Sequence, residues 1–81
     1  MTNALPSLSP VLHNIHVNVV SAEEASLGVA EFWSGNRMIG FTRIEDSDLT
    51  LRIGPSADGV VLGAHALAEA LAEANRLLAL Y

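Results

Sequence analysis

Between Leu27 and Ile53, three short apolar runs are separated by two pairs of turn residues, Gly35-Asn36 and Asp46-Ser47. Pairs of this kind join neighbouring antiparallel strands through two-residue hairpin turns. We therefore predict a three-stranded antiparallel meander in this part of the chain. The remaining segments must then be added to the edge and the faces of the meander.

The two turns also predict which side chains share a face, because directly opposed residues lie on the same side of a sheet. The predicted pairs are Trp33 with Met38, Phe32 with Ile39, Glu31 with Gly40, and Phe41 with Arg52. The predicted core face consists of Leu27, Val29, Trp33, Met38, Ile44, Leu49, Leu51 and Ile53, with Glu31 and Gly40 among them. The second face combines large apolar residues with three of the four arginines: Phe32, Ile39, Phe41, Arg37, Arg43 and Arg52. We expect this second face to bind a partner, since large apolar side chains would otherwise stand in water.

The segment before the meander is predicted to supply an arm and a further strand. Residues 1–12 contain two prolines and no sustained periodicity, so they are predicted to form a flexible arm. From His13 to Val20, apolar and polar side chains alternate, which is typical of a strand with one apolar face. Residues 21–26 are predicted to form a polar connection to the meander.

The segment after the meander is predicted to end in a helix. From about Ala64 to Leu80 the chain is rich in Ala, Leu and Glu, which are strong helix formers, and Gly63 is a candidate N-cap. One apolar stripe is formed by Leu67, Leu71, Ala74 and Leu78. The predicted fold class is α+β, with residues 13–81 as one domain. It consists of a three- to four-stranded antiparallel meander with one C-terminal helix packed on one face, in the order β-β-β-β-α.

The composition of the 81-residue chain favours assembly between copies. A domain of this size buries only about 60–70% of the surface that its unfolded chain exposes, yet 51% of these residues are hydrophobic. We therefore expect a homodimer with twofold symmetry. Nine acidic residues against four arginines give a formal net charge of −5, which disfavours nucleic acid or a ribosome as the partner.

The sequence contains no motif for thiol chemistry, for metal or cofactor binding, or for a membrane. The chain has no cysteine, and no metal-binding or cofactor-binding pattern is found, so neither a metal ion nor a cofactor is expected. No stretch approaches the roughly 18 apolar residues of a membrane span, and the N-terminus lacks the pattern of a secretory signal. We therefore expect a cytoplasmic protein without a membrane partner.

Glu31 and His16 are the candidates for catalysis, although no complete catalytic motif is present. A carboxylate among apolar groups can serve as a general acid or base, especially beside a histidine. A four-residue turn at residues 22–25 would place His16 opposite Glu31, whereas a turn one residue different would reverse the faces. The alternative is a carboxylate at the sheet edge that is satisfied by water or by a backbone N–H. On the helix, His65 and Glu69 are predicted to form an ordinary i,i+4 pair.

Some of these residues also follow a known pattern. They are the run from Trp33 to Gly40, then Arg43, Ile53-Gly54 and Ala64-His65-Ala66-Leu67. The pattern resembles that of small actinobacterial dormancy-associated proteins of uncertain function, and the resemblance covers about residues 30–78. It implies a fold similar to the double-stranded-RNA-binding and ribosome-hibernation class, with a three-stranded sheet, a helix and a dimer. Those relatives carry more basic residues around the strands, where this chain has only Arg37, Arg43 and Arg52.

Three functions remain as hypotheses. The first is a small non-enzymatic accessory or regulatory protein that acts through protein–protein contacts and self-associates through its sheet face. The second is a ribosome- or RNA-associated stress or dormancy factor, which the resemblance implies. The third is a small-molecule-binding protein or enzyme that uses Glu31, His16 and Trp33.

Overall fold

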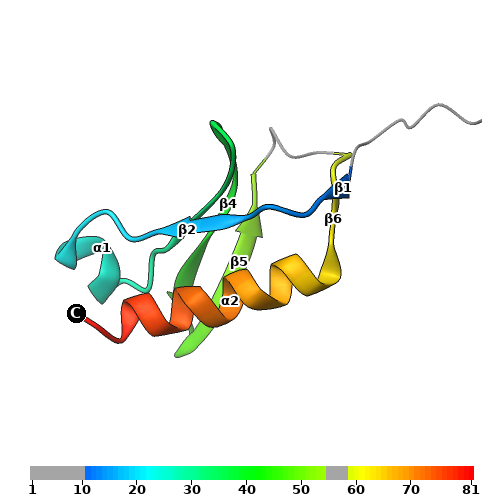
Figure 1. The fold of residues 1–81 in the computed structure, drawn as a ribbon. Helices are drawn as coiled ribbons and strands as arrows, with labels where there is room; N and C mark the ends of the chain where they lie inside the picture. Colours follow the sequence, from blue (N-terminus) through cyan, green and yellow to red (C-terminus); the bar gives the residue numbers. More distant parts are fainter. Residues whose placement is uncertain (1–10, 55–58) are drawn as a thin grey trace, which may run out of the picture.

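The computed structural model describes residues 11–54 and 59–81. The elements in these ranges are β1 (Val11–Leu12), β2 (His16–Asn18), α1 (Ala22–Ser26), β3 (Glu31–Ser34), β4 (Arg37–Glu45), β5 (Asp48–Ile53), β6 (Val61–Leu62) and α2 (Ala64–Leu78). Strands β2, β3, β4 and β5 form an antiparallel sheet in that order, and α2 runs alongside β2 on one side of it (Figure 1). The predicted α+β class, a four-stranded antiparallel sheet with a C-terminal helix, is confirmed.

Both predicted hairpin turns form, and each has the backbone conformation that a two-residue turn requires. In the β3–β4 turn Gly35 has a φ of 62°, which glycine adopts without strain. In the β4–β5 turn Asp46 and Ser47 have φ values of 53° and 66°, the pattern of a type I′ turn. The β4–β5 pairs follow the predicted register along the whole hairpin.

The β3–β4 hairpin departs from the predicted register at a β-bulge. Trp33 opposes Met38, as predicted, but Phe32 opposes Gly40. The extra residue of β4, Ile39, is accommodated between these two pairs. A two-residue turn fixes the register only as far as the first bulge. The predicted pairs of Phe32 with Ile39 and of Glu31 with Gly40 are therefore wrong.

Because of the bulge, the β3 side chains lie on the face opposite to the predicted one. A shift of one residue in the pairing turns each side chain to the other side of the sheet. Phe32 and Ile39, which were predicted on the exposed second face, are buried, with 1% and 2% of their surface exposed. Glu31, Trp33 and Met38 were predicted on the core face. They lie instead on the face that points away from α2.

The pairing of β2 with β3 settles the register of the first predicted strand. Val17 opposes Phe32, so Ile15, Val17 and Val19 pack towards the core. His16 opposes Trp33 and not Glu31. The connection to β3 is not the four-residue turn that was considered for it, because it contains α1.

Helix α1 occupies the segment that was predicted to be a polar connection. The hydroxyl oxygen of Ser21 accepts a hydrogen bond from the Glu24 N–H at 3.1 Å, which is the usual arrangement of a helix N-cap. A second pairing lies outside the main sheet, where β1 runs parallel to β6. Val11 and Leu12 of β1 belong to the segment predicted as a flexible arm, and residues 1–10 of that arm lie outside the described residues.

The core is narrow because α2 contributes alanines where it meets the sheet. Ala70 and Ala74 are buried against Ala30 and Phe32, and their small side chains let the helix axis come close to the strands. The leucines of the predicted apolar stripe pack around this cluster: Leu67, Leu71 and Leu78. Helix α2 begins after Gly63, as predicted. Neither helix in the described ranges is long and apolar enough to cross a membrane.

Candidate functional site

The candidate site is the side of the four-stranded sheet that faces away from α2, which we call the open face. Its cross-strand pairs form four rows. The rows are His16 with Trp33 and Met38, then Asn18 with Glu31, Phe41 and Arg52, then Arg43 with Thr50, and finally Glu45 with Asp48. Trp33, Met38 and Phe41 are half-buried by their neighbours, whereas Arg43, Arg52 and His16 are exposed. The open face therefore presents apolar surface beside guanidinium groups.

Two of the predicted partner-binding residues do not belong to this face. Phe32 and Ile39 are buried, and the bulge replaces them with Trp33 and Met38. The sequence contained one signal for this exchange. An isolated glycine within a strand pattern, such as Gly40, often marks a bulge or a close approach of two backbones.

The other predicted partner-binding residues are accessible. Phe41, Arg43 and Arg52 share the open face. Arg37 is exposed at the tip of the β3–β4 hairpin, where it opposes Ser34. Arg43 forms no ion pair with any residue in the described ranges.

The indole of Trp33 fixes the position of the Glu31 carboxylate. Trp33 Nε1 donates a hydrogen bond to Glu31 Oε1 at 3.0 Å, and both side chains are partly buried. His16 lies opposite Trp33. The next pair on the same face is Asn18 with Glu31, so His16 is a diagonal neighbour of Glu31. The predicted catalytic pair therefore shares a face, but Glu31 lies on an open sheet surface and not among the apolar residues of the core.

A second carboxylate on the open face is held by arginine. Arg52 Nε donates a hydrogen bond to Glu45 Oε2 at 2.9 Å, and Arg52 Nη2 contacts the same oxygen. This hydrogen bonding, together with attraction to Arg52 and Arg43, lowers the pKa of Glu45 below its ordinary value. Glu45 is consequently an ionised partner of Arg52 at neutral pH.

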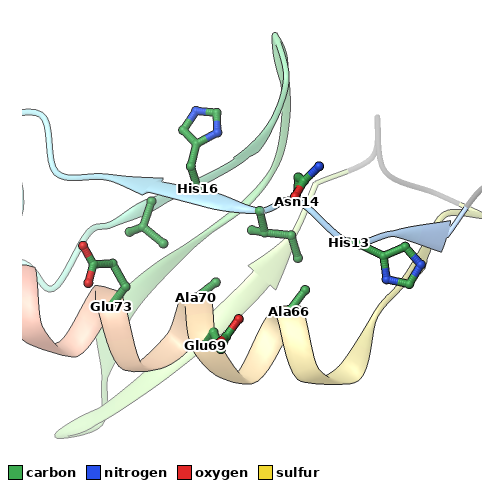
Figure 2. Close-up of a pocket in the computed structure, with 9 residues that line it drawn as sticks. His13, Asn14, His16, Ala66, Glu69, Ala70 and Glu73 are labelled. Atoms are coloured by element: carbon green, nitrogen blue, oxygen red, sulfur yellow. The ribbon is translucent and has the colours of Figure 1, made fainter.

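A groove of about 560 Å³ lies between residues 13–17 and α2. Figure 2 shows its titratable side chains at separate places: His13 near the start of α2, Glu69 and Glu73 on the helix, and His16 pointing away from the helix. His16 therefore belongs to the open face more than to this groove. No convergent pair of acid and base is seen among the side chains labelled in this view.

Neighbours along α2 already engage both carboxylates of the groove. Glu69 Oε2 lies 3.4 Å from His65 Nε2, so the predicted i,i+4 pair is formed. Glu73 accepts hydrogen bonds of 2.8 and 2.7 Å from the guanidinium of Arg76, which lowers the pKa of Glu73. Within the described part of the chain, no three His, Asp or Glu side chains are grouped so that they could hold a metal ion.

Fold and site together define a small α+β domain whose sheet has one helix-covered face and one open face with aromatic and arginine side chains. No protein-family model matches the chain, and no significant similarity was found to curated proteins or to solved structures.

Proposed function

We propose that this protein is a small non-enzymatic accessory or regulatory module that acts through protein–protein contacts. The open face is the proposed contact surface, and the proposed partner presents acidic and apolar side chains. The observation that supports this function is the grouping of Trp33, Phe41 and Arg43 on the face that α2 leaves uncovered.

The apolar part of the open face has the residue types that dominate protein interfaces. Trp33, Met38 and Phe41 come from two adjacent strands and remain partly accessible. Aromatic residues, methionine and arginine are enriched in the centres of protein–protein interfaces. The aromatic side chains combine a large contact area with few rotatable bonds. Covering these side chains would remove apolar surface from water.

The charges on the open face favour an acidic partner. Three of the four arginines of the chain lie on this face or at its hairpin tip: Arg37, Arg43 and Arg52. Several carboxylates lie instead on the two helices: Glu23, Glu24, Glu69 and Glu73. Of the carboxylates that do share the open face, Glu31 and Glu45 are engaged by Trp33 and Arg52, and Asp48 lies opposite Glu45 on the edge strand β5. Arg43 forms no ion pair within the described ranges, so an incoming carboxylate could bind its guanidinium without breaking one.

The unique tryptophan provides a direct test of this function. The 81-residue chain is titrated with a peptide of alternating Glu and Leu while the emission of Trp33 is recorded. A saturable shift that weakens with added salt is expected, and a peptide of alternating Lys and Leu should give none at the same concentration. No shift, or the same shift with both peptides, would contradict the proposal.

Matched variants localise the response. Phe41→Ser combined with Arg43→Glu should weaken peptide binding by about tenfold or more, because it removes an aromatic contact and reverses a charge. Arg76→Glu makes the same charge change on α2 and should leave the response intact. If the wild-type chain dimerises and only the Phe41→Ser, Arg43→Glu variant is monomeric, a second copy occupies the open face, as the sequence suggested.

A ribosome- or RNA-associated stress factor is the second candidate function. It is favoured by the placement of Trp33 and Phe41 on an open sheet beside Arg43, because aromatic side chains on a sheet can stack on unpaired bases. Retention of the chain on ribosomes or structured RNA at low salt, and its release at high salt, would support this function. Absence of binding at low salt would remove it.

A further inference from the structure

Strand β5 forms an edge of the main sheet, and in the described ranges nothing pairs with its outer side. It contains no proline and pairs with β4 over its full length, so it is a regular edge. Edges of this kind expose a row of backbone donors and acceptors to which a further strand can bind.

The hydrogen bonding of β4 identifies which β5 groups point outwards. Thr42 and Ile44 of β4 donate their N–H groups away from β5, to carbonyls at 2.9 and 3.0 Å. Their partners on β5, Leu51 and Leu49, therefore belong to the pairs that exchange no hydrogen bonds with β4. It follows that the N–H and C=O groups of Leu49 and Leu51 point to the free edge.

We propose that β5 binds the β5 strand of a second copy of this chain, antiparallel, about a twofold axis at Thr50. Asp48 of each copy then lies opposite Arg52 of the other, and Leu49 lies opposite Leu51. The two edges are self-complementary, because two ion pairs form on the open face and two leucine pairs form on the core face.

The charges select this register among the alternatives. A twofold axis perpendicular to the sheet must pass midway between a residue of β5 and the same residue of the second copy, since opposed side chains share a face. An axis at Leu49 would place Asp48 opposite Thr50, and an axis at Leu51 would place Arg52 opposite Thr50. Only the axis at Thr50 sets each Asp48 opposite an Arg52.

Arg52 can join this contact without leaving Glu45. Its side chain is still 58% exposed in the ion pair with Glu45, and a guanidinium group has five N–H donors. In the dimer it would lie between Glu45 of its own chain and Asp48 of the second copy. Such an arrangement gives one cation two carboxylate partners.

The core face of the same hairpin also favours a second copy. Helix α2 runs along β2 at the opposite edge of the sheet, and Ile44 and Ile53 of the β4–β5 hairpin each remain 50% exposed. In the proposed register Leu49 and Leu51 of one copy lie opposite Leu51 and Leu49 of the other, and Ile53 lies at the end of this row, opposite Ser47 of the second copy. Apolar surface that one protomer leaves in water would thus be covered by the other.

This contact goes beyond the proposed function and does not depend on it. The paired copies would form one continuous eight-stranded sheet with both open faces on the same side. A partner with two acidic segments could then bind both faces at once, which raises its apparent affinity.

Charge reversal followed by mixing tests the register. Asp48→Arg alone and Arg52→Asp alone each set like charges opposite one another in both pairs of the homodimer. Sedimentation of the full chain should show a concentration-dependent dimer for the wild type and a dissociation constant raised by on the order of tenfold or more for each variant. An equimolar mixture of the two variants should regain the dimer, because the arginine introduced in one chain would then lie opposite the aspartate introduced in the other.

The controls separate this edge from other causes of dissociation. Glu69→Arg on α2 makes the same charge change as Asp48→Arg and should leave the dimer intact. The Phe41→Ser, Arg43→Glu variant should also remain dimeric, and Asp48→Arg should still respond to the acidic peptide. A wild type that is monomeric at millimolar concentration, a variant that dimerises as tightly as the wild type, or a mixture that stays monomeric would overturn the proposal.

Discussion

At Gly40 the backbone of β4 passes so close to β5 that a Cβ atom there would overlap the carbonyl oxygen of Arg52. Gly40 is also the residue that opposes Phe32 on the far side of the bulge. Because no side chain stands in the way, β3 and β5 can both pair with β4 while Phe32 turns towards α2. At the scale of one residue, the separation of the two faces depends on the missing side chain of Gly40.

Replacing Gly40 should therefore be costly although the change is small. Gly40→Ala is expected to lower the free energy of unfolding by about 1–3 kcal/mol, because the overlapping group is backbone and cannot rotate away. In Gly54→Ala the new Cβ would lie 3.5 Å from the Ile39 carbonyl oxygen, an ordinary contact, so its effect should stay within about 1 kcal/mol. Urea unfolding of both variants checks this, and equal stabilities would refute the role assigned to Gly40.

Among the elements, those with local signals were predictable from the sequence and those set by packing were not. Turn dipeptides and helical spacing specify the two hairpin turns and α2. The bulge turns Phe32 towards Ala70 and Ala74 of α2, and its one local signal, the isolated Gly40, does not specify which residue is the extra one. Consequently Phe41, Arg43 and Arg52 were placed on the correct face, and Phe32 and Ile39 were not.

Helix α1 was missed for a different reason. Five residues are too few to show helical periodicity. The available signal was Ser21 followed three residues later by Glu24, which is the pattern of a capping box. The structure confirms half of that motif, the hydrogen bond from the Glu24 N–H to the Ser21 hydroxyl.

Two ion pairs, one on the β4–β5 hairpin and one on α2, give the elements a shared dependence on pH. Arg52 and Arg76 lower the pKa of Glu45 and Glu73 below the ordinary value of 4.5. A carboxyl with a lowered pKa in the folded state stabilises the fold above its unfolded pKa and loses this contribution as the pH falls through the folded pKa. Both pairs are exposed to solvent, so the effect should be small and reduced by salt.

The double variant Arg52→Ala, Arg76→Ala should isolate this contribution. Its urea midpoint is expected to lie below that of the wild type near about pH 6, and the gap should narrow towards about pH 3 as the carboxylates are protonated. A gap that stays constant over this range would show that the arginines stabilise the fold through packing of their aliphatic stems and not through charge.

At the scale of the whole molecule, the sheet has two unlike sides because one helix can cover only one of them. The covered side is closed by Phe32 and the alanines of α2, and the open side keeps Trp33 and Phe41 within reach of a partner. The proposed contact with an acidic protein and the proposed pairing of β5 strands both depend on this division of the side chains.

The division is tested most directly by the free energies of unfolding of Phe32→Ala and Phe41→Ala, measured side by side in urea. Phe32→Ala should cost about 3–5 kcal/mol or abolish the cooperative transition, because it opens a cavity beneath α2. Phe41→Ala should cost only about 1 kcal/mol, since its ring is partly in solvent already. Equal costs, or a larger cost at Phe41, would contradict the assignment of the two faces.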